Sequence, residues 1–425
     1  MSHLHSSSVA VHPLDAEDLL REILLRLPPQ PSALPRASLV CKLWHGILSD
    51  YRFLRHFRLH HRKPSLLGVF DRGFDRVPTF TPILDPPNRI PAARFTLPKN
   101  RRSYKDDHWY IMSCRHGLAV LVHPPGREIV VWDPLANQQK CVPFPPGIHD
   151  IVYPSWFWHA VLICVDAEDG HVHGDCFSSP FKLVFIWGVQ YKQEFACLYE
   201  SGSGVWGNFV PMVFPDHIDH TGPNVVVGNA IYWLFHKGDV AAFDFERQSF
   251  ALIEEPDDAH TTNYKSVQLL RTENGGLGLA VLSEMIIKLW DRITNRDGVG
   301  RWLLLQKTIQ LELFPCTMRT DCEMVLIVGY DEDSNVIVLS TAIGNFILEV
   351  DSVQIRHIIK RDTLCYKTLH PYTSFHIGVT PCEDDIGLGS KNCELYSSVG
   401  SLVQRTKKQV IRMFTTVGSK KNEPS

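Results

Sequence analysis

The sequence predicts two domains: a small all-α module of three helices at residues 13–62 and a large all-β domain at residues 65–375. In the first part, apolar residues recur at helical spacing until a Pro-Pro pair interrupts them. From about residue 65, short apolar runs alternate with turn residues, which is the pattern of many short strands. The length of 425 residues, with 44% hydrophobic and 21% charged residues, suits a globular protein with more than one domain.

The overall composition argues against several classes of protein. A formal net charge of −3 gives no indication of a nucleic-acid or membrane partner. The 11 cysteines, without a C-x-x-C pair, argue against a disulfide framework and a structural zinc site, and they suit a reducing compartment. The N-terminus lacks the features of a signal peptide, and every apolar run is shorter than the roughly 20 residues of a membrane helix. We therefore expect a protein of the cytoplasm, the nucleus or both.

The first predicted helix follows a polar segment, residues 1–12, which we expect to be disordered. Asp15 is a suitable N-cap, and Glu17 and Asp18 place negative charge in the first turn, where the helix dipole favours it. The prolines Pro28 and Pro29 end the helix. Its broad apolar stripe consists of Leu19, Leu20, Ile23, Leu24 and Leu27.

Two further helices are predicted, one beginning after Ser32 and one over residues 51–61. Cys41 lies on the main apolar stripe of the second helix, so we expect an inert, buried thiol there. The third helix brings Phe53 and Phe57 together at i, i+4. The main stripe of the second helix consists of Leu34, Ala37, Cys41, Trp44 and Leu48, at spacings of three and four residues.

This module has more apolar surface than its own core requires. About 45 residues are near the size at which a core alone is marginally stable, and one stripe on each helix is enough to close a small bundle. Leu39 and Leu43 lie on a different side of the second helix, so they need another partner. Two alternatives are open at this point: the following domain covers them, or a separate protein does.

Residues 14–57 resemble the F-box. The shared pattern is L-x-x-x-x-L-L-x-E-I-L-x-R-L-P, then S-L-V-C-K-x-W, then D-x-x-F, with the one departure that Asp15 stands where the F-box usually has proline. The resemblance implies that the helices bind a Skp-type adaptor, which connects them to a cullin scaffold and a RING-bound ubiquitin-conjugating enzyme. The adaptor-binding residues that it implies are Leu14, Leu20, Ile23, Leu24, Leu27, Pro28, Leu39, Val40, Cys41, Leu43 and Trp44.

The β domain is predicted from repeated strand–turn–strand segments. Three of them close with an apolar residue before aspartate, at Trp132-Asp133, Phe243-Asp244 and Val350-Asp351, separated by 111 and 107 residues. Each interval fits two or three repeats of roughly 40–50 residues, so we predict a degenerate, kelch-like β-propeller with about six or seven blades. Over most of residues 65–375 the segments resemble the propeller-like domain of a large family of plant, especially grass, F-box proteins. Residues 376–425 fit no blade and form a turn-rich, basic tail that we expect to be solvated.

Motifs of catalysis or cofactor binding are missing from the sequence. It has no phosphate-binding loop, no dinucleotide fingerprint, no G-x-S-x-G and no H-E-x-x-H. The best metal candidate is DGHVHGD at residues 169–175, where His171 and His173 share a strand face. Two histidines without a further defined ligand favour a polar loop over a metal site. We therefore expect no catalytic residue, no metal and no cofactor.

The function implied by these resemblances is that of a non-catalytic substrate receptor in an SCF-type cullin–RING ubiquitin ligase. The F-box module would bind the Skp-type adaptor, and the β domain would bind a protein substrate that the sequence does not identify. Neither nucleic acid nor membrane is an expected partner. Two alternatives stay open: an F-box scaffold that does not promote degradation, and an enzyme whose site lies in the propeller channel.

Overall fold

The structure is a computed structural model that describes residues 17–375, apart from several internal segments. The predicted disordered segment 1–12, Leu14 and the tail at 376–425 lie outside the described residues. The chain divides into two compact units, with a boundary between Ser65 and Leu66. The internal segments outside the description are 72–76, 98–107, 149–157, 166–172, 175, 190–192, 215–217, 219–221, 236–237, 257–258, 260–265, 295–299, 312–324 and 361–366.

The described part of the helical unit contains four helices, not the predicted three: α1 (Glu17–Leu25), α2 (Ala33–Ser38), α3 (Lys42–Ser49) and α4 (Tyr51–His61). The prediction of one helix after Ser32 was wrong, because the chain leaves α2 at Leu39 and α3 begins after Cys41. Cys41 has extended backbone angles, φ −166° and ψ 169°, so it is the N-cap of α3 and not an interior residue of a longer helix. The break allows both short helices to bury their apolar residues in one core.

A single apolar core holds the four helices together. In α4, Phe53 and Phe57 contact each other as predicted, with ring centroids 6.3 Å apart. The side chain of Asp50 caps α4 by accepting a hydrogen bond from the backbone N–H of Arg52 at 3.0 Å. None of the helices in the described residues is long and apolar enough to span a membrane. The buried core residues are Leu20, Leu24, Leu34, Ala37, Trp44, Ile47, Leu48, Phe53 and Phe57.

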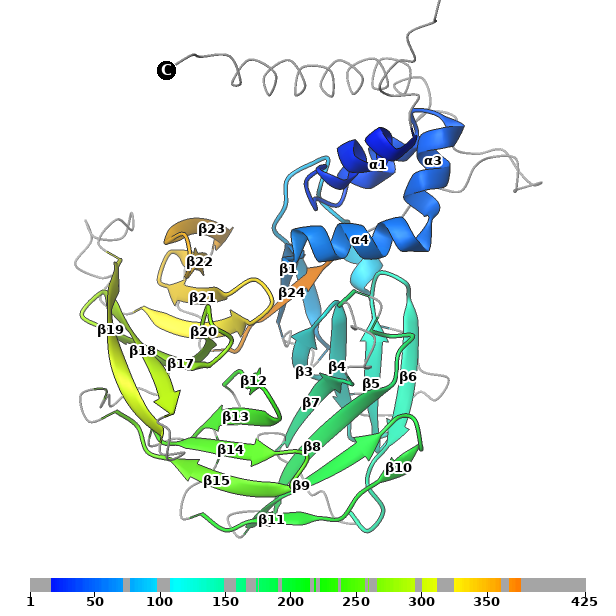
Figure 1. Ribbon diagram of the computed structural model, residues 1–425. Coiled ribbons are helices and arrows are strands. Elements are labelled where there is room, and N and C mark those ends of the chain that lie inside the picture. The colour runs from blue at the N-terminus through cyan, green and yellow to red at the C-terminus, as the bar shows by residue number, and fades with distance from the viewer. Residues whose placement is uncertain are drawn as a thin grey trace, which may run out of the picture. The chain divides into compact units, whose positions relative to one another are not determined.

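The second unit is a β-propeller, which confirms the predicted fold, and its described strands form six blades around a central axis (Figure 1). Five blades are antiparallel sheets of strands that follow one another in the chain. They are β3 (Tyr110–Arg115), β4 (Leu118–His123), β5 (Glu128–Asp133) and β6 (Gln138–Pro143); β7 (Trp158–Cys164), β8 (Phe181–Val189), β9 (Gln193–Glu200), β10 (Val205–Trp206) and β11 (Val210–Met212); β12 (Val225–Val227), β13 (Ala230–Leu234), β14 (Val240–Asp244) and β15 (Ser249–Ile253); β16 (Val267–Arg271), β17 (Leu277–Ser283), β18 (Ile286–Thr294) and β19 (Gly300–Gln310); and β20 (Leu326–Asp331), β21 (Val336–Thr341), β22 (Gly344–Glu349) and β23 (Gln354–Lys360).

The sixth blade joins the two ends of the propeller. Its strand order is β2-β1-β24, where β1 (Ser65–Asp71) and β2 (Thr79–Pro82) come from the start of the domain and β24 (His370–Ser374) from its end. A short 3-10 helix, η1 (Ala92–Phe95), adds Phe95 to the aromatic cluster of this blade, in which the ring centroids of Phe70 and Tyr372 are 5.7 Å apart. The hydroxyl of Tyr372 donates to the carbonyl of Gly117 at 2.7 Å, which connects β24 to the next blade. The last strand therefore closes the ring.

The repeated apolar–aspartate pairs mark the end of the third strand in three blades. Asp133 and Asp244 are the last residues of β5 and β14, and each accepts hydrogen bonds at 2.8–3.0 Å from two backbone N–H groups in the following turn. Asp351 follows β22 and accepts a hydrogen bond from the side chain of Asn335 at 2.7 Å. Aspartate is suited to these turns because its carboxylate satisfies free backbone N–H groups. Successive pairs are two blades apart.

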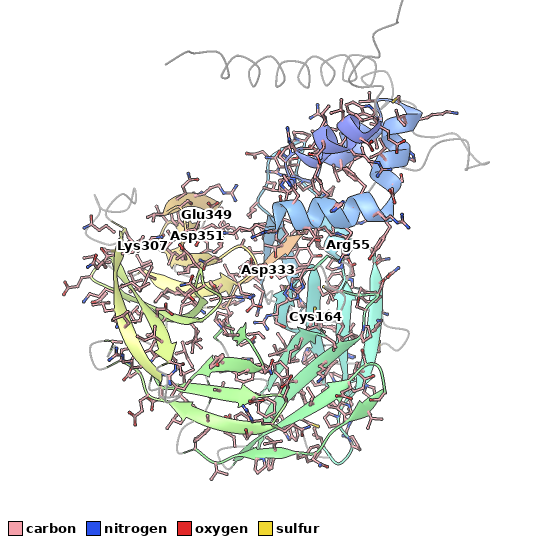
Figure 2. The ribbon with its side chains drawn as sticks, in the orientation of Figure 1. Arg55, Cys164, Lys307, Asp333, Glu349 and Asp351 are labelled. Carbon is pink, nitrogen blue, oxygen red and sulfur yellow. The ribbon has the colours of Figure 1, made fainter. Side chains whose placement is uncertain are left out.

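An outer strand of one blade also contacts a turn of the next. Lys307 of β19 donates from its Nζ to the backbone carbonyls of Val350 at 2.9 Å and Asp351 at 3.2 Å, in the blade that follows (Figure 2). Larger apolar clusters fill the space between the sheets, and the indole side chains of Trp132, Trp158 and Trp233 are among the largest fully buried groups. Packing between the faces of neighbouring blades thus holds most of the propeller together.

Candidate functional site

The helical unit exposes an apolar surface on α1, on α3 and between α2 and α3. Leu19, Leu39 and Leu43 are 52%, 44% and 43% exposed, respectively. The leucines that the sequence left without a partner, Leu39 and Leu43, are thus on the surface. Ile23, Leu27 and Val40 are partly exposed, and Pro28 is exposed. We call Leu19, Leu39 and Leu43, with the partly exposed Ile23, Leu27 and Val40, the leucine surface.

The other residues of the implied adaptor-binding set lie elsewhere. Leu20, Leu24 and Trp44 are part of the core, each at most 5% exposed, so they shape the surface from below. Leu14 lies outside the described residues. The prediction of a buried thiol at Cys41 was wrong: the side chain is exposed, because the residue is the N-cap of α3 and not part of a continuous helical stripe.

An ion-pair network connects α1 to the start of α4. The guanidinium of Arg21 contacts the carboxylate of Glu17 at 2.9 Å and that of Asp50 at 3.1 Å. The hydrogen bond from the backbone of Arg52, with a second from Arg21, lowers the pKa of Asp50 below its ordinary value. Asp50 therefore stabilises both the end of α4 and the packing of α1 beside it.

The propeller contains a cavity of about 370 Å³, where loops of several blades converge. It is a polar recess with charges of both signs, and it suits a ligand that combines hydrogen-bonding groups with charge. Most of its lining comes from the ends of first strands and the loops that follow them. Its charged lining residues are Arg115, Lys182, Glu246, Arg271 and Glu332.

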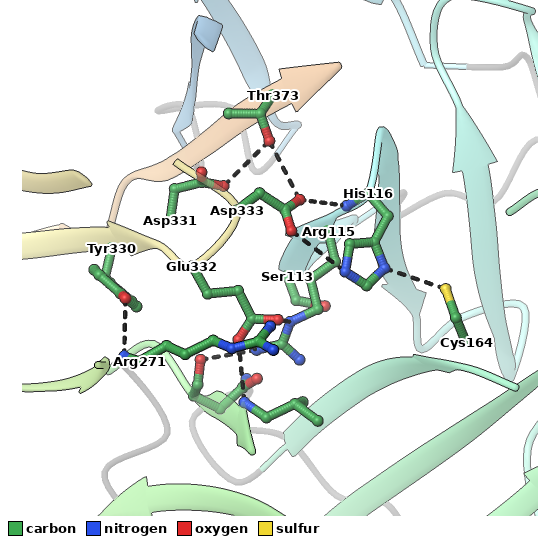
Figure 3. A network of polar contacts seen from close by, with 12 residues as sticks. Ser113, Arg115, His116, Cys164, Arg271, Tyr330, Asp331, Glu332, Asp333 and Thr373 are labelled. Atoms are coloured by element: carbon green, nitrogen blue, oxygen red, sulfur yellow. Dashed lines mark hydrogen bonds and ion pairs between the residues drawn. The ribbon is translucent and has the colours of Figure 1, made fainter. Parts of the chain in front are cut away.

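Arg115 is the centre of a buried network beside this cavity (Figure 3). Its Nε lies 3.0 Å from Oε1 of Glu332, and its Nη2 lies 3.1 Å from Oε2 of the same carboxylate. The same Nη2 donates to the backbone carbonyl of Asn224 at 2.9 Å, and Glu332 accepts from the backbone N–H of Val226 at 3.1 Å. Both charged side chains are about 5% exposed, so losing one would leave an uncompensated charge in the interior. The network holds three blades in a fixed arrangement.

His116 lies between a carboxylate and a thiol. Its backbone N–H donates to Asp333 at 2.8 Å, its Nε2 lies 3.3 Å from Oδ1 of Asp333, and its Nδ1 lies 3.1 Å from Sγ of Cys164 (Figure 3). Burial disfavours the imidazolium, but the charge and hydrogen bond of Asp333 outweigh it and raise the pKa of His116. Burial likewise opposes ionisation of Asp333, but the neighbouring imidazolium keeps the pKa of that carboxyl below its ordinary value.

Sequence reasoning missed all the polar residues of this network. Arg115 and Glu332 are 217 residues apart in the chain, so no local pattern connects them. The sequence does contain one signal, which is charged residues at the end of a buried strand or directly after it. Arg115 is the last residue of β3, and Glu332 and Asp333 follow β20. His116 adopts φ 52°, a left-handed conformation uncommon for a residue other than glycine, and only the structure reveals it.

Family models match both units in the order in which they occur. Residues 17–56 match the F-box domain. Residues 110–375 match the model described as F-box protein AT5G49610-like, beta-propeller. The chain is thus an F-box protein of the plant type with a C-terminal β-propeller. It belongs to the AT5G49610-like family of F-box β-propeller proteins, and the resemblance drawn from its residues is confirmed.

Three relatives from Arabidopsis thaliana are F-box proteins. The putative F-box protein At1g47765 is 30% identical over 33% of this chain and 34% of its own length. The putative F-box protein At3g16210 is 23% identical over 53% and 55%, and the F-box/LRR-repeat protein At2g43260 is 23% identical over 66% and 64%. The chain thus spans between about a third and two thirds of these relatives. Among solved structures, a β-propeller domain of Cps50 (Swd1) from Myceliophteria thermophila is 13% identical, over 70% of this chain and 88% of that one, with a TM-score of 0.34.

Proposed function

We propose that this protein is the substrate-recognition subunit of an SCF-type cullin–RING ubiquitin ligase. In this proposal the F-box binds a Skp-type adaptor, and through it a cullin, while the propeller binds a protein substrate. The family membership of both units supports this assignment. We further propose that the protein works in the cytoplasm, the nucleus or both, and that neither nucleic acid nor membrane is its partner.

The contribution of such a subunit is proximity, not chemistry. It holds a substrate near the ubiquitin-conjugating enzyme and thereby raises the effective concentration of substrate lysines at the reacting thioester. On this proposal the protein itself is not an enzyme. The polar cavity and the loops around it are the part of the propeller best suited to the substrate, because loops on a rigid scaffold commonly carry specificity.

The observation that carries the proposal is the leucine surface. Leu19, Leu39 and Leu43 are each more than 40% exposed, although the helical unit already has a complete core beneath them. Several large apolar side chains left exposed on a small module are typical of a protein–protein interface. The F-box match supports a Skp-type adaptor as the proposed partner of this surface.

The test replaces the exposed leucines and leaves the core intact. We expect Leu39→Asp and Leu43→Asp to weaken binding of a purified Skp-type adaptor at least about 30-fold, the equivalent of about 2 kcal/mol for a hot-spot residue. A titration of the full chain with the adaptor measures the effect, and unfolding temperatures should match the wild type because neither side chain is buried.

Leu59→Asp is the matched control. Leu59 is 43% exposed on α4 and does not belong to the leucine surface, so its replacement should leave the affinity unchanged. Equal affinity of all three variants and the wild type would contradict the assignment of this surface.

A second experiment separates a receptor from a scaffold. Partners captured from cells with an inhibited proteasome are identified by mass spectrometry and then tested as acceptors in a reconstituted ligase reaction. Transfer of ubiquitin to a captured protein, dependent on Leu39 and Leu43, is the expected result. Capture without transfer would favour the scaffold alternative.

A further inference from the structure

We propose that His116, Cys164, His173 and Cys176 bind one Zn²⁺ ion at the rim of the propeller cavity. Their ligand atoms all lie within 4.8 Å of one another. Two thiolates and two imidazoles form a common ligand set of structural zinc, which prefers four nitrogen and sulfur donors in tetrahedral geometry. The inference concerns the propeller alone and holds whether or not the F-box binds an adaptor.

Two separate parts of the propeller supply the ligands. His116 directly follows β3, Cys164 is the last residue of β7, and His173 and Cys176 belong to the segment between β7 and β8. Nδ1 of His116 lies 3.1 Å from Sγ of Cys164, and Nδ1 of His173 lies 3.7 Å from Sγ of Cys176. In a tetrahedral site with Zn–N near 2.1 Å and Zn–S near 2.3 Å, such donors are about 3.6 Å apart. Both distances are therefore within a small movement of the bound geometry.

Asp333 gives His116 the orientation that a zinc ligand needs. A ligating histidine almost always donates its second ring N–H to a carboxylate or carbonyl, which fixes the ring and its tautomer. Nε2 of His116 contacts Asp333 at 3.3 Å, so Nδ1 points toward Cys164 (Figure 3). The side of the ring that faces Asp333 and Glu332 is less suited to a cation, because the carboxylate of Glu332 is already paired with Arg115.

His173 is the ligand that must move most. Its ring is stacked on His116 with centroids 3.5 Å apart and planes 16° apart. A metal lies in the plane of each imidazole that binds it, so two stacked rings cannot share one ion until one of them turns. His173 is exposed, whereas His116, Cys164 and Cys176 are partly or fully buried. The buried three thus form the fixed part of the site, and His173 completes it.

Two other chemistries use some of the same atoms. Cys164, His116 and Asp333 stand in the order of a nucleophile, base and orienting carboxylate, and the two cysteines are near enough to suggest a disulfide. A catalytic triad requires neither Cys176 nor His173, and a disulfide requires neither histidine. Convergence of all four donors favours zinc.

The site also revises an expectation from the sequence. The stretch at residues 169–175 favoured a polar loop because it offered only two histidines. The structure places one of them, His173, beside Cys176, which directly follows this stretch, and beside His116 and Cys164 from other parts of the propeller, while His171 lies outside the described residues. A zinc ion here would connect the segment before β8 to the turn after β3, and so fix one rim of the cavity that His116, Cys164 and His173 line.

The test measures zinc in the full chain, expressed without a polyhistidine tag. Elemental analysis after extensive dialysis should give about one zinc ion per chain in the wild type. Cobalt substitution should give the intense d–d bands of a tetrahedral site and thiolate-to-cobalt charge transfer. Cys164→Ser and Cys176→Ser should lose both signals. Cys141→Ser is the matched control, since that cysteine is exposed and lies outside the cluster, and it should keep both.

Two further variants guard against loss of folding. His173→Ala changes an exposed side chain and should weaken zinc binding while the far-ultraviolet circular dichroism stays that of the wild type. Asp333→Asn should lower zinc affinity about 10–100-fold in competition with a chelating dye, as expected of a residue that orients a ligand. A wild-type chain that takes up no zinc would overturn the proposal. A Cys164–Cys176 disulfide in a non-reduced digest would also overturn it. So would rapid and selective alkylation of Cys164 in a chain that is purified without metal and never exposed to a chelator.

Discussion

Single residues of the helical unit separate folding from binding. Leu24 is fully buried, so we expect Leu24→Asp to unfold the helices and to lose adaptor binding as a consequence, because an unpaired carboxylate in an apolar core costs several kcal/mol. Trp44→Ala should destabilise the unit by about 3–5 kcal/mol. Hydrogen exchange of the full chain measures both effects in α1–α4. If Leu24→Asp abolished binding while α1 kept its protection, Leu24 would belong to the interface and not to the core.

The exposure of Cys41 gives a chemical probe of the same surface. We expect a maleimide to modify Cys41 rapidly and to leave Cys197 unmodified, because burial raises the pKa of Cys197 to about 12 and blocks access to it. A saturating Skp-type adaptor should protect Cys41, whereas labelling of the exposed Cys141 in the propeller should not change. Peptide mass spectrometry reports each site. Labelling of Cys41 that ignores the adaptor would place the interface away from the start of α3.

Which residues are apolar was readable from the sequence, but which of them are buried was not. The steps of three and four residues between Leu34, Ala37, Cys41 and Trp44 fit one continuous helix, and on that helix Cys41 is internal. The break at Leu39 to Cys41 changes this, because tertiary packing of two short helices outweighs the local preference for one long helix. Leu39 and Leu43 were correctly separated from the core stripe. The module has more apolar residues than its core requires, wherever the helix breaks.

Among the elements, α4 depends on its N-cap. We expect Asp50→Ala to lower the unfolding temperature of the helical unit more than Asp50→Asn, since asparagine can still accept the hydrogen bond from the backbone of Arg52. The pKa of Asp50 is lower in the folded state than its ordinary value of 3.8, so its stabilisation is fully present above that pH and is lost as the pH falls through the lowered pKa.

Thermal unfolding as a function of pH measures this prediction. The difference between the wild type and Asp50→Ala should be constant near neutral pH and should shrink under acidic conditions. A difference that grows with acidification would contradict the role of the ionised carboxylate. Added salt should reduce only the part of the stabilisation that comes from the Asp50–Arg21 ion pair, because that ion pair is partly exposed.

Strands of the propeller were easier to predict than its polar centre. Wholly buried strands such as β4 and β21 appear in the sequence as short apolar runs between turn residues, and the aspartates at the ends of third strands repeat. The number of blades was left at six or seven because the repeats share little besides that aspartate. The zinc ligands and the Arg115 network were not predictable, since they come from loops of different blades that meet only when the ring closes.

For the whole molecule, closure of the ring is the decisive event. β24 pairs with β1 and brings Tyr372 into the aromatic cluster with Phe70. The blade β2-β1-β24 therefore contains strands from both ends of the domain. The chain entering β24 also packs closely against β20 of the neighbouring blade, because a Cβ at Gly329 would lie 2.3 Å from the carbonyl oxygen of Leu369. The two ends of the domain therefore fold together, and we expect residues 65–375 to unfold in one cooperative transition when expressed without the F-box.

The matching prediction compares two truncations. A chain that ends at residue 375 keeps β24 and should melt like the full chain. One that ends at residue 369 loses β24, exposes the edge of β1 and removes the fully buried Tyr372, so it should lose several kcal/mol and its single transition. Circular dichroism and limited proteolysis compare the two, and cleavage of the shorter chain should spread through the blades. Capture of a substrate should map to the fragment 65–375 and fail with the shorter chain. If the chain ending at 369 kept both the transition and the substrate, β24 would not close the propeller.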